Sequence, residues 1–144
     1  SSRFEVASRL GVRNIVDVQK QKLEDVVRDL TGGWGVDIAF ETAGSPYALR
    51  DAVSITKRGG KVIVLGLHRK PMDSFDVNNI VYNEKIITGS FSHIPKNWAT
   101  TVYLLESHGI DVKPIISHIL PLEKFEEGIK LAKSRVALKV LLKP

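Results

Sequence analysis

Hydrophobic residues in this chain occur in two alternating patterns, short continuous runs and longer stretches at helical spacing. Val36–Phe40 and Lys61–Leu65 are two short apolar runs, and glycines flank the second at positions 59, 60 and 66. Between them, apolar residues recur every three or four positions, at Ala48, Leu49, Ala52, Val53 and Ile55. Short apolar runs indicate strands and the three-to-four spacing indicates a helix. We expect Ser45 to be the N-cap of this helix and Pro46 its first residue. The pattern therefore predicts a right-handed strand–helix–strand crossover with parallel strands.

The same patterns predict further helices and strands on either side of this crossover. Helices are expected over Arg3–Leu10, Gln19–Leu30, Val77–Tyr82, Pro95–His108 and Leu122–Lys133, and strands over Asn14–Val18, Lys85–Phe91, Ile115–Leu120 and Ala137–Leu142. The polar segment His68–Asp76 is expected to be a loop. Their buried sides are predicted at Phe4, Ala7 and Leu10, at Leu23, Val26, Val27 and Leu30, at Trp98, Val102 and Leu105, and at Phe125, Ile129 and Ala132. Alternating helices and short apolar strands predict an α/β fold with a mostly parallel sheet.

The carboxyl ends of the two central strands are the first candidate for a binding site. Ligands of open parallel sheets bind beyond the carboxyl ends of the strands. Here those ends read Thr42-Ala43-Gly44 and Leu65-Gly66-Leu67, which are small or apolar. Such residues allow a flat ligand to lie against the backbone. The chain nevertheless contains no Gly-x-Gly-x-x-Gly, the phosphate-binding turn of dinucleotide-binding folds.

Composition narrows the classes of protein to which the chain can belong. Its 144 residues are enough for one domain, and 43% hydrophobic and 26% charged residues are ordinary for a globular protein. The 21 basic residues are scattered among 16 acidic ones, which favours a solvated surface over nucleic-acid binding. We see neither a membrane-length apolar run nor a signal peptide, and we expect a cytoplasmic protein. There is no cysteine, and His68, His93, His108 and His118 lack metal-ligand spacing, so no metal site is expected in this chain.

Four blocks in order resemble one enzyme family. They are Arg3–Gly11, Gly33–Gly44, Gly59–Gly66, and Pro114–Lys124 followed by Gly128 and Lys139–Pro144. Together they are similar to the C-terminal part of medium-chain zinc-type alcohol dehydrogenases, nearest the sorbitol, threonine and butanediol dehydrogenases. The resemblance assigns residues 1–144 to the C-terminal part of a dinucleotide-binding domain. It implies an incomplete Rossmann-type, doubly wound parallel sheet that lacks its first two strands, with Val36–Phe40 left as an exposed apolar edge.

The resemblance also implies a function that this chain would share with sequence absent from it. The implied enzyme is an NAD- or NADP-dependent oxidoreductase that transfers hydride between nicotinamide and a secondary alcohol or polyol. Its glycine-rich turn and its catalytic domain, with the zinc, are missing here, so we expect this chain alone to be inactive. Expected partners are the nicotinamide dinucleotide, the missing N-terminal portion and a second copy that pairs near Val77–Phe91. Two alternatives stay open: a non-catalytic nucleotide-binding or assembly module, and a zinc-free quinone reductase.

Cofactor contacts are carried over from the family position by position. Arg3 aligns with a contact to the adenosine ribose, and Lys139 aligns with a basic residue near the pyrophosphate. The adenine and ribose crevice would be lined by Thr42, Ala43 and Gly44. The backbones of Leu65, Gly66 and Leu67, and of Ser90, Phe91 and Ser92, match the stretches that hold the nicotinamide amide. No catalytic residue and no metal ligand is assigned within this chain.

Overall fold

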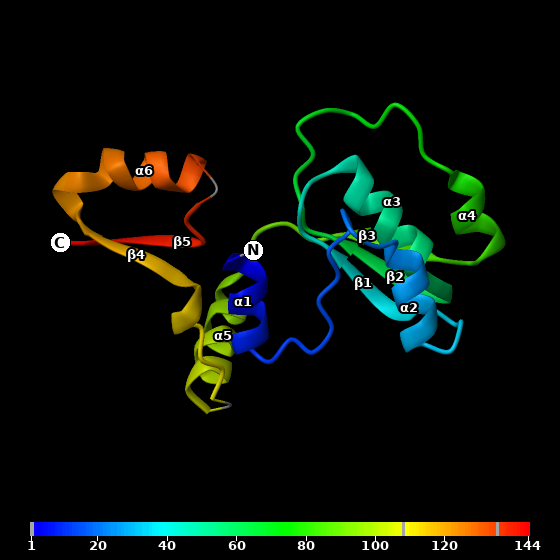
Figure 1. Cartoon of the computed structure of the whole chain (residues 1–144), viewed down its shortest axis with the longest axis horizontal. Helices are drawn as coiled ribbons and strands as arrows, with labels where there is room; N and C mark the ends of the chain where they lie inside the picture. Colours follow the sequence, from blue (N-terminus) through cyan, green and yellow to red (C-terminus); the bar gives the residue numbers. More distant parts are fainter. Residues whose placement is uncertain (1, 108, 135) are drawn as a thin grey trace. The chain divides into compact units, whose positions relative to one another are not determined.

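A computed structural model describes residues 2–107, 109–134 and 136–144 of the chain. The chain forms two compact units, one made of Ser1–Ile15 with His93–Pro144 and the other of Val16–Ser92. Each unit has its own parallel sheet (Figure 1). The expected α/β class with parallel strands is therefore confirmed.

The Val16–Ser92 unit is built on a three-stranded parallel sheet in the order β1-β2-β3. Its strands are β1 (Val36–Glu41), β2 (Thr56–Val64) and β3 (Ile86–Gly89). The predicted central helix is α3 (Pro46–Ile55), which joins β1 to β2 and packs on both. The shorter helices α2 (Leu23–Leu30) and α4 (Val77–Tyr82) pack against α3 (Figure 1). The predicted crossover is thus present, with Pro46 at the start of its helix, although the Ser45 side chain makes no capping hydrogen bond.

The core of this unit lies between α3 and one face of the sheet. It consists of Ala39, Ala52, Val53 and Val62, of which Val62 is completely buried. Successive side chains of β1 point to opposite faces of the sheet, so Ala39 faces this core whereas Ile38 and Phe40 are 48% and 64% exposed. Among the described residues β1 is also an edge strand of its sheet, so the unit presents the exposed apolar edge that the family resemblance implied.

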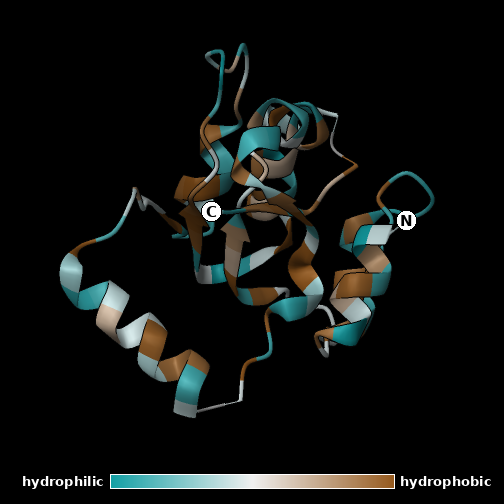
Figure 2. Cartoon of the chain, turned by 90° about the vertical axis from the view of Figure 1, so that its left-hand side faces the viewer, coloured by the Kyte–Doolittle hydropathy of each residue, from teal (hydrophilic) through white to brown (hydrophobic). Residues whose placement is uncertain are grey.

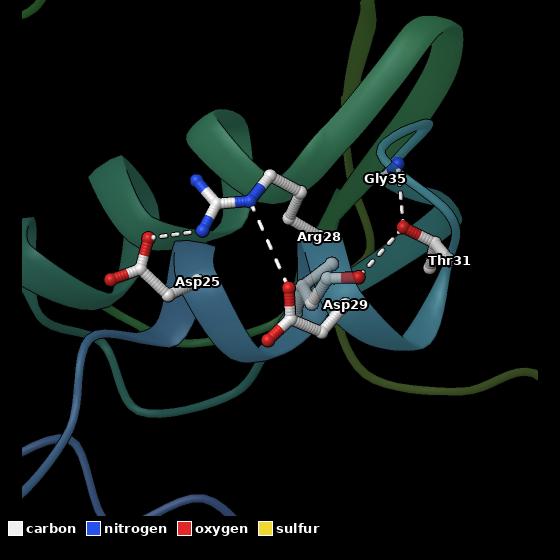
Figure 3. Close-up of polar contacts among 6 residues, drawn as sticks. Asp25, Arg28, Asp29, Thr31 and Gly35 are labelled. Atoms are coloured by element: carbon white, nitrogen blue, oxygen red, sulfur yellow. Dashed lines mark hydrogen bonds and ion pairs between the residues drawn. The ribbon is translucent and has the colours of Figure 1, made fainter.

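The turn that leads into β1 is held by a threonine side chain. Figure 3 shows the Thr31 hydroxyl between the end of α2 and Gly35; it donates to the carbonyl of Val27 at 2.7 Å and accepts from the Gly35 N–H at 2.9 Å. Gly35 has a φ of +85°, and a Cβ there would lie 2.5 Å from the carbonyl oxygen of Ile55. The chain therefore enters β1 beside the end of α3, which only a glycine permits at this position.

Strand β2 begins five residues earlier than the run Lys61–Leu65 predicted. Thr56 pairs with Val36 and Lys61 pairs with Ile38, so residues 57–60 form a bulge between the two pairs. Gly59 has a φ of +70° and donates its N–H to the carbonyl of Asn83 at 2.9 Å. The glycines that were predicted to precede the strand therefore lie within it.

The other unit contains a second strand–helix–strand crossover. Strands β4 (Ile116–Pro121) and β5 (Lys139–Lys143) are parallel neighbours, and α6 (Phe125–Lys133) packs on both (Figure 1). Gly128 allows this approach, since a Cβ there would lie 3.3 Å from Val140 Cγ1. The unit also contains α1 (Ser2–Arg9), α5 (Pro95–Ser107) and the short 3-10 helices η1 (Lys113–Ile115) and η2 (Leu122–Lys124). The predicted helix end at His108 lies outside the described residues.

Two other predictions from local sequence were wrong. Asn14–Val18 is not a strand; it runs into a turn in which the Asp17 carbonyl accepts N–H groups from Lys20 and Gln21. Helix α2 consequently starts at Leu23 instead of Gln19.

Several side chains predicted to be buried are exposed. They are Phe4, Leu10, Leu30, Trp98, Val102, Leu105, Phe125, Ile129 and Ala132. The helices do carry bands of apolar and polar residues, as Figure 2 shows by hydropathy. Helical spacing therefore identified an apolar side of each helix but not how completely the chain covers it.

Candidate functional site

The carboxyl ends of β1, β2 and β3 are joined by backbone hydrogen bonds. The N–H groups of Leu65 and Gly66 donate to the carbonyl of Glu41 at 2.8 and 3.0 Å. The Ser90 N–H donates to the carbonyl of Val64 at 2.9 Å. The structure thus brings together three predicted segments, Thr42–Gly44, Leu65–Leu67 and the residue that follows β3. We refer to this edge, made of residues 42–44, 65–67 and 90, as the strand-end crevice.

Two glycines let the backbones of the strand-end crevice touch. A Cβ on Gly66 would lie 2.1 Å from the backbone nitrogen of Gly44. Gly44 has a φ of +65°, and a Cβ there would lie 2.5 Å from the carbonyl oxygen of Leu67. Both glycines are therefore required by close approach, and Gly44 also by its left-handed conformation. No side chain projects from either position into the space above the strand ends.

Glu41, a buried carboxylate that the sequence analysis missed, holds part of the strand-end crevice through hydrogen bonds to its backbone. The side chain of Glu41 is fully buried, and its Oε1 accepts the N–H groups of Ala43 and Gly44, both at 2.8 Å. Its Oε2 lies 3.6 Å from Nε2 of His68, and neither of these two atoms has a hydrogen-bond partner among the residues that the structure describes. Strand alternation was the available signal, because it places Glu41 on the same face as the buried Ala39.

Most side chains predicted to line the site are open to solvent. Leu65, Leu67 and Phe91 are 44%, 73% and 81% exposed. Ser92 has a φ of +59°, an uncommon conformation for serine that turns the chain after Phe91. These exposures leave the strand-end crevice accessible to a ligand.

Two of the predicted cofactor residues lie in the other unit. Arg3 is on α1 and Lys139 is the first residue of β5. Their roles at a cofactor site therefore stay predictions.

Two clefts lie against helices, away from the strand ends. One of about 480 Å³ lies between α3 and the segment before α4, where Nη2 of Arg50 donates to the carbonyl and hydroxyl of Ser74. Another of about 430 Å³ is lined by residues 18–24 and Asp51. We place the candidate site at the strand ends nevertheless, because the paired glycines and the buried carboxylate meet there and nowhere in these clefts.

Burial shifts the pKa of two ionisable groups, one beside α3 and one on it. Desolvation lowers the pKa of Lys85, whose Nζ donates to the carbonyl of Val53 at 2.6 Å and to Oδ1 of Asn79 at 2.9 Å. Burial, with a smaller contribution from Glu24, raises the pKa of Asp51. The Lys85 ammonium satisfies a carbonyl in the last turn of α3, which is a structural role favoured by the helix dipole.

Within residues 2–107, 109–134 and 136–144, no three His, Cys, Asp or Glu side chains gather as a metal site would require. In the same part of the chain, every helix is too short or too polar to cross a membrane. Residues 42–44, 65–67 and 90 of the strand-end crevice include no His, Cys, Asp or Glu, so their side chains supply none of the ligands that zinc prefers.

A family model described as zinc-binding dehydrogenase matches residues 1–107. The L-threonine 3-dehydrogenase of Bacillus licheniformis is 33% identical over 143 residues, which are 99% of this chain and 41% of that protein. The sorbitol dehydrogenase of Halalkalibacterium halodurans is 27% identical, with the same 99% and 41% covered. The chain therefore spans about two fifths of the length of these curated relatives.

Solved structures of alcohol dehydrogenases also superpose on almost the whole of this chain. An alcohol dehydrogenase from Thermotoga maritima superposes with a TM-score of 0.88 at 25% identity, over 99% of this chain and 40% of that one. The 2R,3R-butanediol dehydrogenase of Bacillus subtilis superposes with a TM-score of 0.84 at 27% identity, over 99% and 41%. The resemblance inferred from the four sequence blocks is confirmed.

Proposed function

Because this chain belongs to the zinc-binding dehydrogenase family, we propose that it is the cofactor-binding part of an NAD- or NADP-dependent oxidoreductase. The observation that carries this proposal is the close approach of Gly44 and Gly66 at the carboxyl ends of β1 and β2. Parallel sheets bind dinucleotides at that edge, where glycines allow the ligand to reach the backbone.

The chain's own residues would bind and orient the cofactor. Thr42, Ala43 and Gly44 would line the adenine and ribose side, while Leu65–Leu67 and Ser90–Ser92 would present backbone groups to the nicotinamide amide. When bound, the nicotinamide accepts or gives a hydride at its C4. Arg3 and Lys139 would supply cations for the ribose or a 2′-phosphate and for the pyrophosphate.

The reaction we propose for the whole protein is hydride transfer between nicotinamide and a secondary alcohol or polyol. Relatives named for L-threonine, sorbitol and butanediol support this substrate class, since each of those compounds carries a secondary hydroxyl. We place the zinc and the substrate pocket in sequence outside these 144 residues. We further propose that residues 1–144 are the C-terminal part of the nucleotide-binding domain, in a cytoplasmic homo-oligomer.

Fluorescence titration with NADH and with NADPH tests the proposal, on the whole protein and on the 144-residue chain. We expect saturable binding by the whole protein to one or both cofactors. The informative variant is Gly44→Ala, whose methyl group would overlap the Leu67 carbonyl; we expect binding at least tenfold weaker, or about 1.4 kcal/mol.

Gly32→Ala is the matched control. Gly32 has a similar φ of +61° but nothing within 4 Å of its Cβ position, and it follows α2 away from the strand ends. It should bind as the parent protein does. Absence of binding by the whole protein to either cofactor would refute the proposed function. Binding without alcohol oxidation would favour the non-catalytic module instead, and quinone reduction the zinc-free reductase.

A further inference from the structure

We propose that Glu41 is a positioning residue for the cofactor, which sets the spacing of the strand-end crevice without touching the ligand. This inference rests on the proposed function and deepens it. It assigns to a buried carboxylate the task of holding two backbone segments in the arrangement that a dinucleotide requires.

Glu41 is the point where the segments of the crevice are tied together. Its carboxylate accepts the N–H groups of Ala43 and Gly44, which fixes the turn after β1. Its backbone carbonyl accepts the N–H groups of Leu65 and Gly66, which fixes the end of β2. Glu41 therefore fixes both segments, residues 42–44 through its side chain and residues 65–67 through its backbone carbonyl.

Gly66 lies directly against this carboxylate. A Cβ on Gly66 would lie 2.6 Å from Oε2 of Glu41, so the Glu41 carboxylate packs directly against the backbone of Gly66. Oε2 also faces Nε2 of His68, the residue that opens the loop 68–76, at 3.6 Å. The carboxylate is thus enclosed by its own turn, by Gly66 and by His68.

Stability of the fold gives a poor account of a carboxylate in this place. Burying an ionised acid is costly unless its oxygens are hydrogen-bonded, and within the described part of the chain Oε2 has no hydrogen-bond partner. The two bonds at Oε1 are charge-assisted, which makes them stronger and geometrically stricter than bonds to a neutral oxygen. The rigidity of the turn is the gain that offsets the cost of burial.

Glu41→Gln in the whole protein tests this directly, because glutamine keeps the shape and removes the charge. Weaker bonds to the turn would leave the crevice correctly spaced for a smaller fraction of the time, and apparent affinity falls by that fraction. We expect Kd for the reduced cofactor, and KM for the cofactor in turnover, to rise about tenfold. We expect kcat to stay within about twofold, because Glu41 does not contact the reacting atoms.

Asp37→Asn is the matched control. It removes a carboxylate from the same strand, but one that is 82% exposed and paired with Lys57 at 2.6 Å, at the other end of β1. It should change neither KM nor kcat by more than about twofold. Unchanged cofactor affinity in Glu41→Gln, or a loss of kcat without a rise in KM, would overturn the positioning role.

Amide exchange of the unmodified whole protein gives a second test, which does not depend on the variant folding. The N–H groups of Ala43 and Gly44 should be protected before cofactor is added, although Thr42 and Ala43 are exposed residues. Exchange as fast as in an open loop would refute the proposal. If the parent protein binds neither NADH nor NADPH, the proposed function itself fails; if it binds and Glu41→Gln binds equally well, only the role of Glu41 fails.

Discussion

The backbones of Gly66 and Gly44 cross so closely that a Cβ added to Gly66 would lie 2.1 Å from the nitrogen of Gly44. This crossing joins the turn after β1 to the segment after β2. It is the tightest glycine contact among the described residues, and it lies where a ligand of a parallel sheet binds.

Gly66→Ala should therefore destabilise the Val16–Ser92 unit strongly. The added methyl group meets backbone atoms, which cannot move aside as a flexible side chain does, and we expect a loss of about 3 kcal/mol in the free energy of unfolding. Urea denaturation measures this change. Gly89→Ala is the control, because nothing lies within 4 Å of its Cβ position and it should change stability by less than about 0.5 kcal/mol. Equal effects of the two substitutions would show that the crossing is looser than the structure has it.

Lys85 should make stability depend on alkaline pH. Its pKa is lowered by burial, so between that value and the usual 10.5 the unfolded chain binds more protons than the folded one. The free energy of unfolding contributed by Lys85 should consequently increase as pH rises through this window. Urea denaturation at a series of pH values, compared with Lys85→Met, isolates the contribution. A parent and variant with the same slope would contradict it.

In acid, Asp51 should make the free energy of unfolding depend on pH in the opposite direction. Its pKa is raised, first by burial and then by Glu24, so between the usual 3.8 and the raised value the folded chain binds more protons. Stability should therefore fall as pH rises through that window. Asp51→Asn should remove this dependence and raise the free energy of unfolding slightly at neutral pH, because the group is only partly buried. Thermal unfolding at pH 3 to 7 measures both; a destabilised variant at neutral pH would contradict the assignment.

The edge strand β1 should make the 144-residue chain associate when it is studied alone. Ile38 and Phe40 leave an apolar, unpaired edge, which is a template for pairing with another chain. Phe40→Lys should reduce association in sedimentation velocity, since a charge blunts such an edge. Trp34→Lys is the control, because Trp34 is 80% exposed but precedes the strand. A parent chain that is monomeric and melts cooperatively would refute the prediction.

The sequence alone predicted the central crossover because its signals are local. Short apolar runs and Pro46 specify β1, α3 and β2 without knowledge of distant contacts. Sequence-based prediction failed where the local structure depends on a contact with another segment of the chain. Asn14–Val18 is apolar enough for a strand but forms a turn at Asp17, and the bulge before Lys61 depends on a bond from Gly59 to Asn83.

The sequence likewise predicted some parts of the candidate site and missed others. Thr42–Gly44 and Leu65–Leu67 follow from the rule that strands end at a common edge, and the structure brings them together. Glu41 was missed because its importance comes from two N–H groups of its own turn, which no spacing rule reveals. Trp98 and Phe125 were predicted as core residues because helical period marks an apolar side, whereas burial depends on what packs over it.

Mapping of NADH binding by amide chemical shifts tests the central claim most directly. Titration of the isotope-labelled whole protein should perturb, saturably and together, the amides of residues 42–44, 65–67 and 90–92. The amides at the opposite ends of β1 and β2, such as those of Gly35 and Gly59, should be unaffected. Saturable shifts confined to those opposite ends, or to the cleft between α3 and Ser74, would contradict a cofactor site at the strand ends.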